Sequence, residues 1–108
     1  MNWREQEAHN EVSFRDQNEW IDGASRSFGF REVTAFVCEC GDGECRKPIE
    51  MTKPEYESVR SVSTHFAIAL NHENPEMETV VSERARYAVV QKVDSFAVRL
   101  ARQRDPRR

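Results

Sequence analysis

The three cysteines of this chain lie within the eight residues 38–45. Cys38 and Cys40 are separated by one residue, and Cys45 follows after a glycine-rich segment. Side chains two positions apart on an extended strand share a face, so the first two sulfurs can point at one site, and a tight turn can return the third. Structural zinc takes four ligands in a tetrahedron and accepts thiolates readily. The spacing therefore predicts a structural metal site, for zinc or for iron.

A fourth ligand has to come from elsewhere in the chain. His72 is the preferred candidate because it lies in a polar loop after a predicted strand, where Glu73 can orient its other ring nitrogen. The alternatives are His65, at the start of that strand, and a water or external ligand, whereas His9 lies in a segment that we expect to be frayed. The predicted ligands are three thiolates and one imidazole: Cys38, Cys40, Cys45 and His72.

Two other interpretations of the cysteines compete with zinc. A thiol-based redox or metal sensor needs an exposed thiol with a lowered pKa. The acidic residues Glu39, Asp42 and Glu44 argue against it, because negative charge raises thiol pKa values and a divalent cation offsets that repulsion. In the simplest alternative, Cys38 is a small buried residue and the other two cysteines are incidental. Three unrelated thiols beside a charged turn would be unusual, so metal binding is favoured.

The elements that position the cluster begin with a predicted helix over 12–28, where apolar residues recur at helical spacing. Ser13 and Asp16 would form its capping box and Gly29 would end it. β-branched and aromatic residues then predict a strand over 32–38, which leads directly into the cysteines. A helix, a strand and a glycine-rich turn therefore precede the site.

After the turn, a return strand is predicted over 48–51. Thr52 and Glu55 have the spacing of a capping box, which predicts a short helix that ends near Arg60. In that helix Tyr56 is expected to pack inward with its hydroxyl group satisfied. The cysteines would thus lie in the connection of a zinc-knuckle-like hairpin.

The last part of the chain predicts a strand over 65–70, a helix over 75–82, a strand over 86–92 and a final helix capped by Asp94. The predicted inward-facing residues of the 75–82 helix are Met77, Val80 and Val81. The acidic side chains before and within that helix are expected to be solvated: Glu73, Glu76 and Glu78. Together the elements predict an α+β fold, a small mostly antiparallel sheet with short helices packed on it.

Length and composition predict one domain over residues 1–108, with a frayed N-terminus (1–9), a folded core (10–98) and a basic C-terminal tail (99–108). Hydrophobic residues make up 38% and charged residues 32%, so a limited core would gain from a structural metal. The tail holds five arginines and one aspartate, which give it a charge of +4. Since the net charge of the whole chain is −3, residues 1–98 carry −7. We expect the tail to be solvated.

These features rank the possible partners. An acidic body would repel phosphate, so nucleic-acid association is the third hypothesis, and Trp3 and Trp20 are expected to pack in the core, pack between helices or form an interface patch rather than stack on bases. No apolar run reaches about 20 residues and the first residues lack the pattern of a signal peptide, which predicts a cytoplasmic protein without a membrane partner. We expect an unidentified protein partner; the oligomeric state is not predicted.

Two motifs resemble a group of short bacterial proteins without an assigned activity. They are Phe-Arg-x-x-Asn-x-x-Ile at 14–21 and Phe-x-Cys-Glu-Cys-x4-Cys at 36–45. The remaining matches are spread over nearly the whole chain: Glu55-Tyr56, Val59-Arg60, His72-Glu73, Pro75-Glu76, Val80-Val81, Tyr87, Val89-Val90, Lys92 and Asp105-Pro106-Arg107. The chain departs from that group in one place: we expect Pro-Gly directly before the histidine there, and this chain has Leu70-Asn71 before His72. The resemblance implies a single cysteine-rich domain and no known reaction.

The leading hypothesis from the sequence is a small zinc-stabilised binding or regulatory module without catalytic activity. Four protein ligands fill the coordination shell of zinc and leave no position for an activated water, so hydrolysis at the metal is not expected. The thiol-based sensor is the alternative hypothesis.

Overall fold

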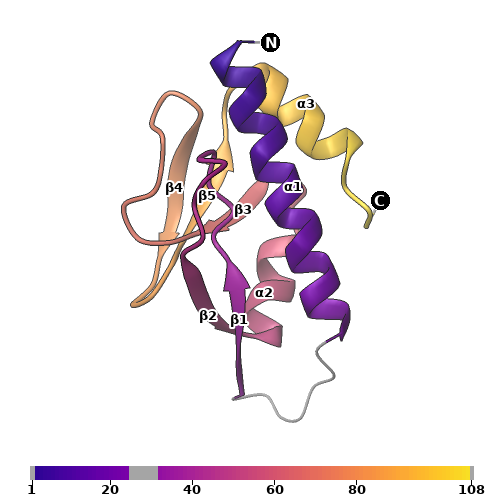
Figure 1. The fold of residues 1–108 in the computed structure, drawn as a ribbon, viewed down its shortest axis with the longest axis vertical. Coiled ribbons are helices and arrows are strands. Elements are labelled where there is room, and N and C mark those ends of the chain that lie inside the picture. Colours follow the sequence, from indigo (N-terminus) through magenta and orange to yellow (C-terminus); the bar gives the residue numbers. More distant parts are fainter. Residues whose placement is uncertain (1, 25–31, 108) are drawn as a thin grey trace.

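The computed structural model describes residues 2–24 and 32–107, and it confirms the α+β class (Figure 1). The described residues form three helices and two small antiparallel sheets. The elements in chain order are α1 (Trp3–Ala24), β1 (Val33–Val37), β2 (Pro48–Thr52), α2 (Lys53–Arg60), β3 (His65–Ile68), β4 (Glu78–Glu83), β5 (Ala88–Lys92) and α3 (Ser95–Gln103).

The two sheets meet at the cysteine segment. β1 and β2 form an antiparallel hairpin with Val37 opposite Pro48, and the second sheet has the order β3-β5-β4 with antiparallel pairs throughout. Just beyond β1, the Glu39 amide donates to the Ala67 carbonyl of β3 over 2.8 Å. The predicted cysteine-bearing hairpin is confirmed, and its connection is joined to the second sheet.

Helix α1 runs along the length of the molecule (Figure 1) and begins much earlier than predicted. Asn2 caps it, because its side-chain oxygen accepts from the Glu5 amide at 2.9 Å. The predicted frayed N-terminus is therefore wrong from residue 3 onward, and Ser13 and Asp16 lie inside the helix rather than at its cap. The predicted end over 25–29 lies outside the described residues.

The early part of α1, residues 3–11, was missed because it buries only Ala8 and Glu11, and the buried face of the whole helix is partly polar. Its buried residues recur every three or four positions, as in any packed helix, yet several of them carry charge or an amide. They are Ala8, Glu11, Val12, Phe14, Arg15, Asn18 and Asp22. A search for apolar periodicity does not detect such a stripe.

The predicted helix over 75–82 is wrong. Asn74 starts a turn, since its carbonyl accepts from the Met77 amide at 2.9 Å and its side chain accepts from the Glu76 amide at 3.1 Å. Strand β4 follows, where the β-branched Val80 pairs with Val90 of β5. Of the residues predicted to face inward, Met77 is fully buried, but Val80 and Val81 are exposed. Pairing with β5 overrides the helical spacing.

The predicted caps of α2 and α3 are confirmed. The Thr52 side chain accepts from the Glu55 amide and the Glu55 side chain accepts from the Thr52 amide, which completes the capping box of α2. Asp94 caps α3 by accepting from the Ala97 amide at 3.1 Å. Local sequence decides these ends because the capping groups lie within three residues of the amides they satisfy.

The predicted basic tail is not a free solvated segment. Helix α3 contains residues 95–103 and lies beside α1 in the same direction (Figure 1). Beyond it, the Asp105 carboxylate is buried and forms an ion pair with Arg60 at 2.5 Å. Arg107 donates to both Glu19 of α1 and Glu57 of α2. Ion pairs thus fasten the chain's end to two helices.

The core lies between α1 and the sheets and includes the stacked rings of Phe36 and Tyr56, whose centroids are 4.5 Å apart. The prediction that Tyr56 packs inward with a satisfied hydroxyl is confirmed. The tryptophans are not core residues, because Trp3 is 47% and Trp20 75% exposed, so only their interface role stays a prediction. No helix in the described ranges is long and apolar enough to cross a bilayer.

Candidate metal centre

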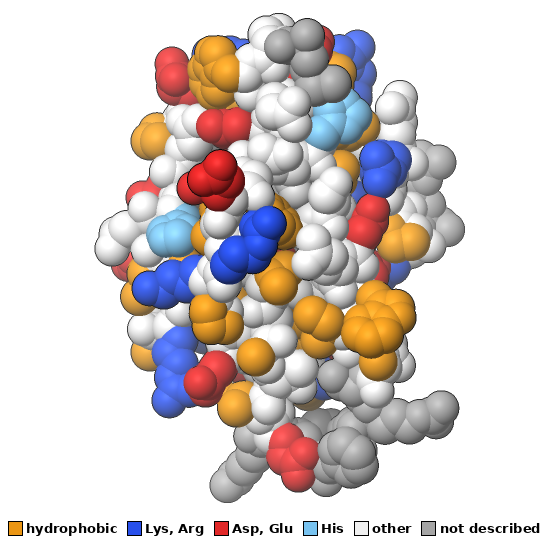
Figure 2. Space-filling model, viewed as in Figure 1, with side chains coloured by type: hydrophobic (Ala, Val, Ile, Leu, Met, Phe, Trp, Pro, Cys, Tyr) orange, Lys and Arg blue, Asp and Glu red, His pale blue; other side chains and the backbone are white. Residues whose placement is uncertain are grey.

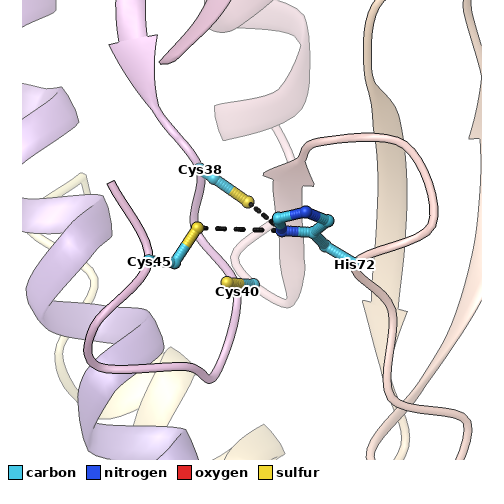
Figure 3. Close-up of side chains that lie close together, drawn as sticks. All are labelled: Cys38, Cys40, Cys45 and His72. Atoms are coloured by element: carbon cyan, nitrogen blue, oxygen red, sulfur yellow. Dashed lines mark hydrogen bonds between the residues drawn. The ribbon is translucent and has the colours of Figure 1, made fainter. Parts of the chain in front are cut away.

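Cys38, Cys40, Cys45 and His72 converge, as the sequence predicted (Figure 3). One ligand atom from each lies within 4.8 Å of all the others. The Nδ1 atom of His72 is 3.5 Å from the Cys38 sulfur and 3.7 Å from the Cys45 sulfur. The cluster could hold a metal ion, and Nδ1 is the ring nitrogen that faces it.

These separations match the edges of a tetrahedral site. With Zn–S bonds of about 2.3 Å and Zn–N bonds of about 2.05 Å, tetrahedral geometry puts sulfur and nitrogen about 3.6 Å apart. The two observed distances, 3.5 and 3.7 Å, bracket that value. The His72 Nδ1 therefore lies at tetrahedral distance from two of the sulfurs, and all four ligand atoms lie within 4.8 Å of one another.

Glu39 aims the first two cysteines. Alternation along the extended chain puts it on the opposite side from its neighbours, and it is fully buried there. Its carboxylate accepts from the Ala67 amide at 2.9 Å, the Tyr56 hydroxyl at 2.7 Å and the Asn18 side chain at 2.8 Å. Burial raises its pKa, and these three donors act in the opposite direction. The residue between Cys38 and Cys40 thus anchors their backbone to β3, α1 and α2.

Helix α1 holds the turn that returns Cys45. The Asn10 side chain donates to the Gly41 carbonyl at 2.8 Å, and the Glu7 side chain lies against Gly41. A Cβ atom at Gly41 would be 2.7 Å from a Glu7 carboxylate oxygen, so glycine permits this close approach. The Cys45 amide donates to the Asp42 carbonyl at 3.0 Å, which closes the turn.

The same helix also holds the loop that carries His72. The Asn74 side chain donates to Glu7 at 3.0 Å, so Glu7 touches both halves of the site. Asn71, directly before His72, has a φ of 68°, a left-handed conformation that asparagine tolerates better than most residues. Its position corresponds to the glycine expected from the family resemblance. Among the described residues, neither Glu73 nor any other side chain bonds the outer ring nitrogen of His72.

The Cys38 sulfur also accepts a backbone hydrogen bond, from the Ala69 amide at 3.1 Å. Amide donors favour negative charge on sulfur. The backbone of Asp42 and of Lys47 acts in the same direction on the pKa values of Cys40 and Cys45. The backbone therefore favours the thiolate form around the site.

In the absence of a bound cation, the three thiols have different pKa values. A hydrogen bond with Cys40 and burial raise the pKa of Cys38, whereas the hydrogen bond from Cys38 lowers the pKa of Cys40 to about 5. Burial raises the pKa of Cys45. The expectation that acidic neighbours raise the thiol pKa values is thus wrong for Cys40, whose pKa is set chiefly by the hydrogen bond from Cys38. Three thiolates together require a positive ion.

The other two histidines lie outside the cluster. His65 begins β3 and pairs with Gln91, and the ring of His9 packs against Phe96 with centroids 5.8 Å apart. Neither alternative ligand considered from the sequence is therefore part of the converging set.

The sequence argument missed the residues that hold the site in place: Glu7, Asn10, Asn18, Glu39 and Asn74. One signal was available, because Asn10 and Asn18 lie on α1 at positions that face the cysteine segment, and Asn18 belongs to the first motif. The signal was missed because the helix was predicted from the spacing of its apolar residues alone.

Comparison with known proteins adds no family. No family model, no curated protein and no solved structure matches this chain. The resemblance to the bacterial group with the Phe-x-Cys-Glu-Cys-x4-Cys motif stays a prediction.

Proposed function

We propose that this protein is a small zinc-stabilised binding or regulatory module. The observation that carries the proposal is the convergence of three sulfurs and the His72 Nδ1 within 4.8 Å, with that nitrogen at tetrahedral distance from the Cys38 and Cys45 sulfurs. Three thiolates and one imidazole form a set that structural zinc commonly uses. The backbone amides directed at the sulfurs support the thiolate form that the metal needs.

Bound zinc would join two parts of the chain that the fold brings together. Cys38, Cys40 and Cys45 belong to the connection of the β1–β2 hairpin, and His72 belongs to the loop after β3. With four protein ligands the ion has no open position, so its role is structural and not hydrolytic. The stabilised surface would then serve a protein partner.

The surface supports a protein partner better than nucleic acid. Acidic and basic side chains are interspersed over the face shown in Figure 2, and the described residues there form no broad basic area. Several arginines of the C-terminal segment are paired with carboxylates, among them Arg104 with Asp16 and Arg107 with Glu19. Phosphate binding needs unpaired positive charge on one face.

Metal analysis with a matched pair of histidine variants tests the proposal. Protein purified without added metal should contain zinc, and His72→Ala should lower zinc affinity by about 100-fold or more, since even indirect partners of ligands contribute 10–100-fold. His65→Ala is the control, because His65 lies outside the cluster, and it should leave affinity unchanged. Equal affinities for the two variants would exclude His72 as a ligand.

A thiol-based sensor is the second candidate. Cys45 is only partly buried, and the pKa of Cys40 is lowered to about 5, so the metal-free cluster combines an accessible sulfur with a thiolate. Alkylation rates distinguish the two candidates. A structural zinc site protects all three thiols until a chelator removes the metal, whereas a sensor has a thiol that reacts without chelator.

A further inference from the structure

A pocket of about 510 Å³ lies on the side of the molecule formed by α2 and the second sheet. Its floor is apolar and comes from Val59 of α2 and Val89 of β5. Pro54 and Val81 add apolar walls from α2 and β4. Volumes of roughly 300–1,000 Å³ with an apolar lining are typical of small-molecule sites. The residues that line this pocket include neither His72 nor any of the cysteines.

A β-bulge shapes one wall. Val80 pairs with Val90 and Ser82 with Val89, so Val81 is an extra residue in β4. In a regular strand, neighbouring side chains point to opposite faces, yet Val81 and Ser82 both line the pocket. Bulges redirect side chains in this way and are frequent beside binding sites. The wall is therefore a feature of the sheet and not an accident of surface packing.

The opposite wall is tied to the sheet by a hydrogen bond. The Tyr87 hydroxyl of the β5 segment donates to Glu55 of α2 at 3.0 Å. Glu55 also accepts from the Thr52 amide at 2.8 Å, so both of its oxygens are engaged. The backbone hydrogen bond from Thr52 lowers the pKa of Glu55, which keeps it ionised and bound to these donors. Glu55, the one carboxylate among the described residues of the lining, thus has hydrogen-bond partners of its own, and the nearby charge of Arg84 also lowers its pKa.

The remaining polar groups of the pocket are donors without partners in the described residues. The Arg84 guanidinium forms no ion pair there, and the His65 ring forms no hydrogen bond there. The hydroxyl groups of Ser58 and Ser82 also line the pocket. A guanidinium presents a planar fork that matches a carboxylate. Free donors above an apolar floor favour an anionic head attached to an apolar body.

We propose that this pocket binds a small organic acid, with its carboxylate at Arg84 and its aliphatic or aromatic body over Val59 and Val89. The site is independent of the metal centre, so the protein would carry a ligand site as well as a structural ion. Selectivity for an acid over an alcohol or an amine of the same length would come from Arg84 and His65. The apolar floor would select against acetate, which has no body to bury.

Titration calorimetry with the metal-loaded full chain tests the proposal, with octanoate as the probe and 1-octanol, octylamine and acetate as matched comparisons. Octanoate should bind saturably at one site and at least about ten-fold more tightly than each of the others, in keeping with a charge-assisted hydrogen bond. Arg84→Gln should weaken octanoate at least about ten-fold. Arg102→Gln, on α3, is the control and should have no effect.

Amide chemical shifts measured by NMR locate the ligand. Octanoate should shift the amides of Ser58, Ser82 and Val89 and leave those of the cysteine turn unchanged. Absence of saturable octanoate binding would overturn the proposal. Octanol binding as tightly as octanoate, or an undiminished affinity in Arg84→Gln, would overturn the assignment of an acid.

Discussion

Two neighbouring polar clusters in this protein are buried in different ways. The cysteine centre brings together three sulfurs and one imidazole, all of which can be ligands and none of which is a fixed cation. The other cluster, formed by Glu11, Lys92 and Glu78, contains its own counterion: the lysine contacts Glu11 at 2.5 Å and also contacts Glu78. All three of these side chains are at most 2% exposed. One cluster could hold an ion from solution, and the other already contains a cation that contacts both of its carboxyl groups.

The two clusters are physically joined. The Asn74 amide donates to Glu78 at 2.9 Å, and the Asn74 side chain donates to Glu7, which lies against the cysteine turn. Asn74 also lies in the loop that carries His72. A buried charged group needs compensation within a few ångströms, whether from an ammonium group or from a metal. Loss of the compensating cation should therefore lower the stability of the fold at both clusters, and the loss should be larger at the cysteine centre.

The largest effect is expected at the cysteine centre. Cys38→Ser should lower the melting temperature by about 15 °C or more, because the free energy of metal binding is free energy of folding. A chelator should shift the wild-type protein to nearly the same melting temperature and should hardly change the variant. Differential scanning calorimetry with and without chelator measures both. A wild-type protein whose melting temperature does not respond to chelator would contradict a structural ion.

The second effect concerns the lysine of the ion cluster. Lys92→Met leaves the buried carboxyl groups of Glu11 and Glu78 without their cation and should lower the free energy of unfolding by about 3–5 kcal/mol. The triple variant with Glu11→Gln and Glu78→Gln removes both carboxyl groups and should recover part of that loss. Urea titrations with saturating zinc measure these differences. A single variant as stable as wild type would show that the lysine does not compensate buried charge.

The two clusters should change the stability of the protein in opposite directions as the pH rises. Burial raises the pKa of Glu11 from 4.5 to about 8, an effect that the charge of Lys92 only partly offsets. The folded state therefore retains a proton that the unfolded state releases, so this contribution is complete below pH 4.5 and is lost as the pH rises toward 8. Zinc binding has the opposite sign, because thiols must lose protons.

Urea titrations from pH 5 to about 8.5, with saturating zinc, test this sign. Glu11→Gln, which cannot ionise, should show a flatter decline of stability over this range than wild type. A decline of the same slope in both proteins would assign the titration to another group.

The smallest effect distinguishes two tyrosine hydroxyls. Tyr56→Phe removes a donor from the buried Glu39 and should lower the free energy of unfolding by about 1.5 kcal/mol, and it should also weaken zinc binding. Tyr87→Phe, whose hydroxyl bonds the partly exposed Glu55, should cost about 0.5 kcal/mol and leave zinc affinity unchanged. Equal zinc affinities in the two variants would show that Glu39 does not position Cys38 and Cys40.

The two clusters also differ in how far the sequence could predict them. The type and close spacing of the cysteines identify them as candidate ligands, and His72 could be chosen because it follows a strand in a polar loop. Glu11, Glu78 and Lys92 carry no such signal, since charged residues are usually solvated. Glu78 was accordingly assigned to a solvated acidic segment, and the structure shows it 2% exposed. Pairing with Lys92, 14 residues away, explains its burial.

The wrong secondary-structure predictions have the same origin. The start of α1 was missed because residues 3–11 bury only Ala8 and Glu11, and apolar periodicity cannot register so short a stripe. The helix predicted over 75–82 fails because β5 offers Val80 and its neighbours a pairing partner that the local sequence does not reveal. Tertiary partners decided both elements.

The sequence by itself determined the α+β class, the hairpin around the cysteines, the caps at Thr52 and Asp94, and the identity of the four converging residues. These depend on local spacing and on groups a few residues apart. Only the tertiary structure decided that Glu39 anchors the cysteines, that α1 holds both halves of the site, and that a bulge in β4 shapes a separate pocket. The first two depend on which distant side chains compensate a buried polar group, and the third depends on the register of β4 against β5; both are fixed only when the chain has folded.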